Sequence, residues 1–200
     1  LIPRASRPSS GHRSGNRGHC DRILRVVTTF PSLVREKYAV NILVAGGAGM
    51  IGSHLCETLV RAGHEVVCLD NLSTARFENL AILSRLPRFH FIQHDNTRDL
   101  PALPPPDRIY HLASPASPVG YTRLPIETML ANSEGTRRLC ELAIAHRARF
   151  LFCSTSEIYG DPLQHPQRED YRGNVSTLGP RAAYDVSKRY AEAMTMAFSR

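Results

Sequence analysis

The fold is decided by residues 41–52, which read NILVAGGAGMIG. An apolar run suited to a β-strand stops at a glycine cluster, and apolar residues at helical spacing follow at Ile51 and Leu55. The glycines at 46, 49 and 52 allow a chain reversal, close approach of backbone N–H groups to a pyrophosphate, and close packing of helix on strand. The stretch predicts a strand, a tight turn and a helix whose N-terminus binds the phosphates of a dinucleotide.

A carboxylate ends the next apolar run, residues 65–69. Asp70 lies 24 positions after Gly46, near the spacing expected of the carboxylate that binds the ribose hydroxyls of a dinucleotide. A carboxylate there repels a 2′-phosphate, and Arg76 is the only basic side chain in residues 71–76, so NAD is favoured over NADP. An ordinary turn without a ligand is the alternative, which the glycine spacing and Asp70 together disfavour.

Strand-like and helix-like segments alternate along the chain. Strands are expected at 41–45, 65–69, 88–93, 108–113 and 149–154, and helices at 50–62, about 75–86, about 124–147 and from about 183 onward. This order predicts an α/β fold with a doubly wound parallel sheet (Rossmann), whose ligand lies at the carboxyl ends of the strands. The long loop over 160–182 is expected to be functional.

Charge is concentrated near the start of the 200-residue chain, whose formal net charge is +7. Residues 1–25 hold six arginines and one acid, so we expect a disordered basic tail over 1–38 and an NAD-binding Rossmann domain over 39–200. An RNA-binding arm or an organellar transit peptide are alternatives for the tail. Because the positive charge belongs mainly to the tail, no nucleic-acid partner is expected.

Several other classes of site are disfavoured. The five cysteines form no CxxC pair, which argues against a disulfide framework and for a reducing, cytoplasmic location. His90 and His94 lie far apart on a predicted strand without an accompanying metal-binding motif, so no metal is expected. The absence of an apolar run near ~20 residues predicts no membrane span.

Two side chains four residues apart suggest proton transfer. On a helix, Tyr184 and Lys188 share a face. The ammonium group and the positive nicotinamide ring are expected to lower the pKa of the phenol, so that it can take a proton from a sugar hydroxyl while a hydride leaves for NAD. Taken alone, such a pair is usually a solvated helix face, but its position downstream of the glycine turn favours the catalytic interpretation.

Hydroxyl groups and a carboxylate follow the last predicted strand, where the segment STSEIYGDP covers residues 154–162. In a doubly wound fold this edge carries the site, so Thr155, Ser156 and Glu157 are candidate catalytic residues. The alternative is a helix N-cap, which the following Gly160 and Pro162 disfavour because they do not continue a helix.

With these motifs, residues of about 40–200 resemble the extended short-chain dehydrogenase/reductase family of nucleotide-sugar enzymes. The resemblance implies that Tyr184 is the base, that Lys188 is its partner, and that Thr155 hydrogen-bonds the reacting hydroxyl. It also places Ser156 and Glu157 beside the carboxylate and C5 of the sugar. The implied NAD-binding residues are Gly46, Gly49, Met50, Ile51, Gly52, Asp70, Asn71, Asp95, Leu112, Ala113, Ser114, Tyr184 and Lys188.

Within that family, YHLASPASP (residues 110–118), STSEIYGDP and Gly179-Pro180-Arg181 resemble the branch that decarboxylates UDP-glucuronate to UDP-xylose through a 4-keto intermediate. The related 4,6-dehydratases carry Thr-Asp-Glu at the strand end, and the 4-epimerases lack the Glu; both remain alternatives. A non-catalytic NAD-binding module is an alternative of another class, against which the intact tyrosine and lysine count. The chain departs from the branch at Met50, Asn96 and Val186-Ser187.

Family members are longer than 200 residues. The resemblance therefore implies that a C-terminal substrate domain is largely missing here, and that this piece alone is expected to bind NAD weakly and to catalyse nothing. It also implies a homodimer that pairs through two helices.

Overall fold

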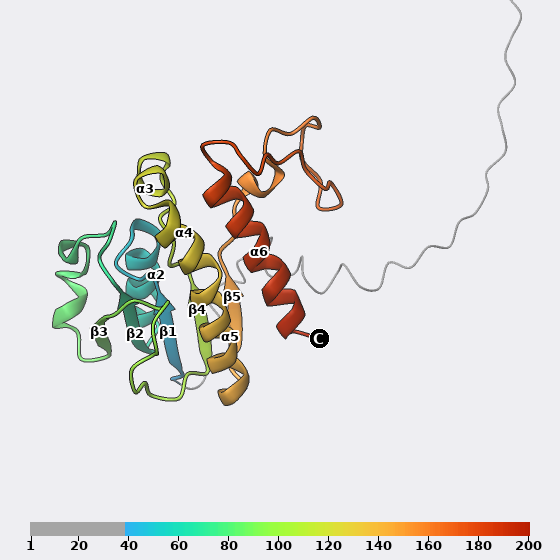
Figure 1. The fold of residues 1–200 in the computed structure, drawn as a ribbon. Coiled ribbons are helices and arrows are strands. Elements are labelled where there is room, and N and C mark those ends of the chain that lie inside the picture. Colours follow the sequence, from blue (N-terminus) through green and yellow to red (C-terminus); the bar gives the residue numbers. More distant parts are fainter. Residues whose placement is uncertain (1–38) are drawn as a thin grey trace, which may run out of the picture. The chain divides into compact units, whose positions relative to one another are not determined.

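The computed structural model describes residues 39–200, so the predictions for the basic tail fall outside the described residues. Five parallel strands form one sheet in the order β3-β2-β1-β4-β5 (Figure 1). The strands are β1 (Asn41–Ala45), β2 (Glu65–Asp70), β3 (Phe89–Gln93), β4 (Arg108–His111) and β5 (Arg149–Phe152). The reversal of strand order on either side of β1 is that of a doubly wound fold, as predicted.

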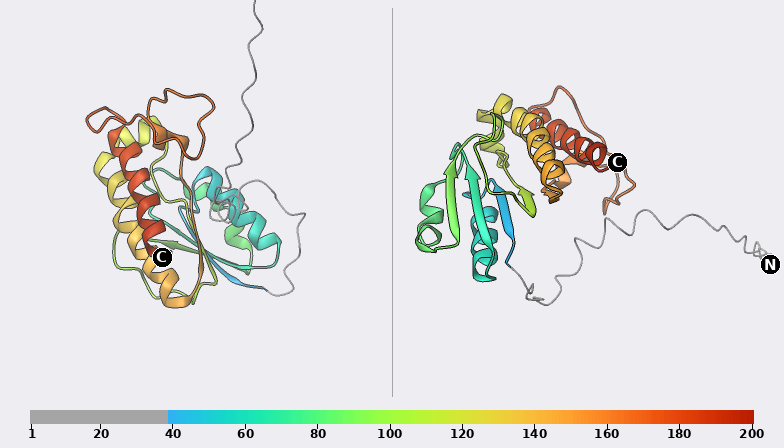
Figure 2. Two further views of the ribbon diagram at one scale, coloured as in Figure 1. Left: turned by 90° about the vertical axis from the view of Figure 1, so that its right-hand side faces the viewer. Right: turned by 90° about the horizontal axis from the view of Figure 1, so that it is seen from below.

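Helices cover both faces of this sheet (Figure 2). They are α2 (Met50–Arg61), α3 (Pro118–Arg123), α4 (Pro125–Asn132), α5 (Glu134–His146) and α6 (Ala182–Phe198), with short 3₁₀ turns η1 (Phe77–Leu80), η2 (Leu83–Arg85) and η3 (Ser156–Tyr159). Alternate residues of β1 point to opposite faces. Ile42 and Val44 join the core under α2, whereas Leu43 and Ala45 join the core under α5. The continuous apolar character of β1 is thus explained by burial on both sides.

Two helix predictions were wrong in detail. The helix expected at about 75–86 is two separate 3₁₀ turns, because only Leu80 and Leu83 of these turns are buried and a longer amphipathic helix would have little to pack. The long helix expected at about 124–147 is divided at Ser133 into α4 and α5. Asn132 and Ser133 donate side-chain hydrogen bonds to carbonyls of the preceding turn, and such bonds compete with regular helix geometry.

Helix α3 was not predicted, although its start carries a recognisable signal. Pro118 occupies the first helical turn, and the Ser117 hydroxyl accepts a hydrogen bond of 3.0 Å from the Gly120 amide. Strands β4 and β5 end two residues earlier than expected, which leaves residues 112–114 and 153–155 as irregular chain at the sheet edge. Within residues 39–200, no helix has both the length and the apolar character that a membrane crossing requires.

Candidate active site

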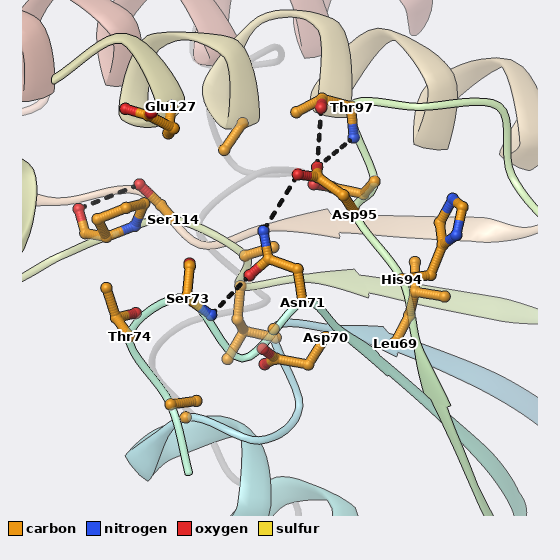
Figure 3. Close-up of a pocket in the computed structure, with 18 of the residues that line it drawn as sticks. Leu69, Asp70, Asn71, Ser73, Thr74, His94, Asp95, Thr97, Ser114 and Glu127 are labelled. Atoms are coloured by element: carbon orange, nitrogen blue, oxygen red, sulfur yellow. Dashed lines mark hydrogen bonds between the residues drawn. The ribbon is translucent and has the colours of Figure 1, made fainter. Parts of the chain in front are cut away.

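A cavity of about 380 Å³ lies at the carboxyl ends of the central strands (Figure 3). Its walls come from the glycine turn, from the chain after β2, β3 and β4, and from α4. Eight of the predicted NAD-binding residues line it: Gly46, Gly49, Asp70, Asn71, Asp95, Leu112, Ala113 and Ser114. This is the crevice in which a doubly wound fold binds its ligand.

The glycine turn is shaped by close contacts of its backbone. Gly46 has a φ of +81°, and a Cβ there would lie 2.5 Å from the Ala113 nitrogen. A Cβ on Gly52 would lie 2.2 Å from the Gly46 oxygen, so this glycine lets α2 pack against the turn. A Cβ on Gly49 would meet no protein atom closer than 3.5 Å. Gly49 lines the cavity, so the space left by its missing side chain is open to a ligand and is not filled by another part of the protein.

Asp70 combines a structural role with its place in the cavity wall. One carboxylate oxygen accepts a hydrogen bond of 3.0 Å from the Ala48 amide, and the other accepts one of 2.8 Å from the Leu72 amide. The carboxylate therefore ties the glycine turn to the end of β2. Since each carboxylate oxygen can accept more than one hydrogen bond, the group retains capacity for ribose hydroxyls.

A second polar cluster lies after β2 and β3. Asn71 donates to Asp95 at 3.2 Å, and Asp95 also accepts from the Thr97 amide at 2.9 Å and the Thr97 hydroxyl at 2.8 Å (Figure 3). Burial raises the pKa of the Asp95 carboxyl, but these hydrogen bonds and the nearby charge of Arg98 outweigh it, so the pKa is lowered overall. Asp95 is thus an anionic hydrogen-bond acceptor in the cavity wall.

A buried amide connects the cavity to α6. The Nδ2 atom of Asn132, at the end of α4, lies 3.0 Å from the Ser114 hydroxyl and 3.1 Å from the Ser187 hydroxyl. Ser187 in turn donates to the Tyr184 carbonyl at 3.1 Å. Ser114 belongs to the cavity wall, so this network fixes Tyr184 relative to the cavity.

Tyr184 and Lys188 share the inner face of α6, as predicted, and both are almost fully buried. The Tyr184 ring stacks on Tyr121 of α3, with centroids 4.8 Å apart and an interplanar angle of 10°. The Lys188 ammonium donates to the Cys153 carbonyl at 2.9 Å and lies 4.6 Å from the centroid of the Phe152 ring. The pair is therefore held where β5 ends.

The expected effect of Lys188 on the phenol is not what the structure gives. Burial raises the pKa of the Tyr184 hydroxyl, and a hydrogen bond from the Thr155 side chain opposes the rise without reversing it. The Lys188 ammonium lies 5.9 Å from the Tyr184 ring centroid and is directed at the Cys153 carbonyl. Burial also lowers the pKa of Lys188 to about 8, so its charge is itself disfavoured in this position.

Of the strand-end candidates, Thr155 contacts the same phenol. Glu157 is half-buried in η3 and forms an ion pair with Arg181. The N-cap alternative is also realised, because the Thr155 hydroxyl accepts from the Glu157 amide at 3.3 Å and begins η3. Ser156 is exposed. A short 3₁₀ turn thus carries Thr155, Ser156 and Glu157 at the end of β5.

The remaining predicted NAD-binding residues lie outside the cavity walls. Met50 and Ile51 are exposed at the start of α2, Gly52 is buried beneath the turn, and Tyr184 and Lys188 lie behind Ser114 and Asn132. Sequence reasoning missed the lining residues Ser73, Thr74, Ala75, Leu69, His94, Asn96, Thr97, Arg98, Pro115, Glu127, Leu130 and Ala131. The lining residues that follow β2, β3 and β4 could have been found from the sequence, because ligands of this fold bind where strands end. No local sequence pattern indicates that the α4 residues line the cavity.

Residues 42–200 match the model of the NAD dependent epimerase/dehydratase family. The chain belongs to this family. UDP-glucuronic acid decarboxylase 1 of Arabidopsis thaliana is 50% identical over 161 residues, which are 80% of this chain and 37% of that protein. The protein of the same name from Danio rerio is 47% identical over 165 residues, 82% of this chain and 39% of that protein. The chain thus spans well under half the length of these curated relatives.

Solved structures of other enzymes share the fold. The Bordetella bronchiseptica enzyme WbmG in complex with NAD has a TM-score of 0.67 and 25% identity, covering 82% of this chain and 52% of that one. UDP-glucose 4-epimerase from Thermotoga maritima, solved with UDP-glucose, has a TM-score of 0.67 and 28% identity, covering 80% and 51%. The decarboxylases are therefore the nearer relatives in sequence among these proteins.

Proposed function

We propose that the full-length protein carrying this sequence decarboxylates UDP-glucuronate to UDP-xylose with a retained NAD. The observation that carries the proposal is the meeting of Tyr184, Thr155 and Glu157 at the end of β5, beside a cavity suited to a dinucleotide. The identity of 43–50% to proteins named UDP-glucuronic acid decarboxylase supports this activity over others in the family.

The cavity residues fit NAD. Gly49 leaves space at the turn before α2, whose N-terminal N–H groups suit a pyrophosphate, and the carboxylate of Asp70 suits ribose hydroxyls better than a 2′-phosphate. NAD, when bound, supplies the acceptor for a sugar hydride and later its donor, so the reaction involves no net oxidation.

Proton transfer is assigned to Tyr184. Its phenolate oxygen is to take the proton of the C4 hydroxyl of the sugar, and the hydrogen bond from Thr155 favours this ionised form. Burial opposes the phenolate, so the positive charge of a bound nicotinamide ring would have to favour it before the substrate proton is taken. Lys188 holds the loop after β5 through the Cys153 carbonyl and so keeps Thr155 next to the phenol.

Decarboxylation then follows from the chemistry of the sugar. A ketone at C4 is β to the carboxylate on C5, so CO₂ leaves and its electron pair enters an enolate. Reprotonation at C5 and reduction of the ketone give UDP-xylose. Ser156 stands where the dehydratases carry an acidic residue, so the group that expels water in those enzymes is replaced, and Glu157 is the carboxylate proposed to lie beside C5.

The test is to incubate the full-length protein with UDP-glucuronate and NAD and to analyse the products by mass spectrometry. The proposal predicts CO₂ and UDP-xylose in equal amounts. UDP-galacturonate without CO₂ would instead identify a 4-epimerase, the runner-up that the shared fold of the epimerase structures favours. Bound NAD without any change in the sugar would indicate a non-catalytic module.

We also propose that the full-length protein is a homodimer. Ile126 and Met129 lie one helical turn apart on α4 and expose apolar side chains, as does Ile144 on α5, and a second copy that covered such side chains would remove apolar surface from water. Sedimentation equilibrium measures the mass directly, and a mass of one chain at micromolar concentration would contradict the dimer.

A cytoplasmic location is proposed on the state of the cysteines. Cys56, Cys68, Cys140 and Cys153, the four within the described residues, are free thiols, which is typical of a reducing compartment. Recovery of the native protein in an organellar or secreted fraction would contradict this location.

A further inference from the structure

Arg181 forms an ion pair that the proposed reaction does not yet use. This residue immediately precedes α6, and its guanidinium contacts the carboxylate of Glu157 in η3. The same cation acts on Asp185, one turn into α6, whose side chain is more than nine-tenths buried and has one oxygen without a hydrogen-bond partner. Arg181 is therefore paired with Glu157, and its charge also opposes the rise in pKa that burial gives the Asp185 carboxyl.

The backbone around this pair is fixed by the long loop over 160–181. The Arg189 guanidinium donates to the carbonyl of Ile158 at 2.6 Å and to that of Arg172 at 3.0 Å, and so joins η3 to the loop. Asn174 forms backbone hydrogen bonds with Tyr159 at 2.8 Å and with Asp161 at 2.9 Å. These contacts hold the middle of the loop against the end of η3, and the Arg181–Glu157 ion pair joins the end of the loop to η3.

The other cations of α6 are directed elsewhere. Lys188 is buried against Phe152 and the Cys153 carbonyl, and Arg189 binds two backbone carbonyls. Arg181, by contrast, is half-exposed, and its ion-pair partner Glu157 is about two-thirds buried. Its charge is therefore available at the side of the site where a sugar would lie against Glu157.

We propose that Arg181 is a positioning and specificity-determining residue, which compensates the charge of Glu157 and so allows a sugar bearing a carboxylate to bind beside it. This inference rests on the proposed function, which places the C5 carboxylate of UDP-glucuronate next to Glu157. Two carboxylates at close range in a half-buried site repel each other. A neutral sugar meets no such repulsion, so it has no need of the cation.

The test compares the binding of a carboxylated and a neutral UDP-sugar. Dissociation constants of UDP-glucuronate and UDP-glucose are measured by calorimetry on the full-length protein with NAD, with Tyr184→Phe present throughout so that the sugar is bound but not converted. Arg181→Gln should weaken UDP-glucuronate by about tenfold or more and change UDP-glucose by less than about twofold. Arg181→Lys should recover part of the loss. Arg168→Gln is the matched control, because Arg168 lies in the same loop and pairs with exposed Asp170 away from the site.

Two variants of Glu157 complete the test. Glu157→Gln removes the repelling charge and should tighten UDP-glucuronate, a result that does not depend on the folding of an Arg181 variant. Arg181→Gln alone should selectively weaken the binding of UDP-glucuronate. When Glu157→Gln is added, this selective loss of affinity relative to UDP-glucose should largely disappear. Equal weakening of both sugars by Arg181→Gln, or no tightening in Glu157→Gln, would overturn the role of Arg181.

Failure of this inference can be told apart from failure of the proposed function. If the wild-type protein releases CO₂ but Arg181→Gln weakens the binding of both sugars equally, the decarboxylase activity stands and the role of Arg181 is refuted. If the wild-type protein releases no CO₂ but Arg181→Gln weakens only the binding of UDP-glucuronate, the decarboxylase activity is refuted and the charge compensation is supported.

Discussion

At the scale of single residues, the proposal depends on the hydroxyl of Tyr184. Tyr184→Phe keeps the ring that stacks on Tyr121 but removes the group that takes the substrate proton. We expect turnover to fall by about a hundredfold or more, the range of general-base contributions, while NAD stays bound. Steady-state rates and the NAD content of the purified variant provide the two readouts.

The matched control is Tyr190→Phe. Tyr190 lies on the same helix with a half-exposed side chain, so losing its hydroxyl should leave both readouts unchanged. If Tyr184→Phe lost NAD together with activity, the tyrosine would be a structural part of the cofactor site and not the base.

At the scale of elements, the turn between β1 and α2 makes a paired prediction. In Gly52→Ala, the new Cβ would lie 2.2 Å from the Gly46 oxygen, so helix and turn must separate and we expect a loss of about 2 kcal/mol of stability or more. In Gly49→Ala, the Cβ finds space and the backbone is extended, with φ −68° and ψ 173°, so stability should be unchanged or slightly higher. NAD affinity should nevertheless fall, because this Cβ occupies room that the ligand needs.

Urea unfolding without added NAD and calorimetric titration with NAD separate these two effects. A Gly49→Ala protein that loses stability, or binds NAD as tightly as the wild type, would contradict the assignment of Gly49 to the ligand.

The elements that were predictable are those whose burial is simple. Strands β1 and β2 and helix α2 have long apolar patterns and a glycine turn, and their predicted bounds agree with the structure to within one residue. The break between α4 and α5 could not be predicted, because it depends on where the Asn132 side chain is buried. The loss of the helix at about 75–86 likewise reflects how little apolar surface that segment can bury against the sheet.

The residues of the site were predictable only where polar side chains stand at or just after the end of a strand. Asp70 ends β2, Asp95 and Ser114 follow β3 and β4, and the structure brings all three to one cavity. Asn132 and Glu127 reach this region from α4, and no local pattern indicates their role. The pKa of Tyr184 was predicted to be lowered by Lys188 together with the nicotinamide ring, whereas in the protein without NAD burial raises it and Lys188 is directed at the Cys153 carbonyl. Burial of the phenol and the direction of the lysine side chain are properties of the tertiary structure.

At the scale of the whole molecule, the central claim is that one NAD stays in the cavity while the sugar reacts at the end of β5. A hydride that leaves C4 must then return to the same carbon, since the cofactor is not exchanged between the two steps. If the hydride exchanged with solvent, or the NADH with free cofactor, before the second step, the hydrogen returned to C4 would not be the one that left it.

The direct measurement is to convert UDP-glucuronate labelled with deuterium at C4, using the full-length protein, and to locate the label in the product by NMR. The account predicts UDP-xylose that keeps deuterium at C4, with a new solvent-derived hydrogen only at C5. UDP-xylose that has lost its C4 deuterium would contradict the account.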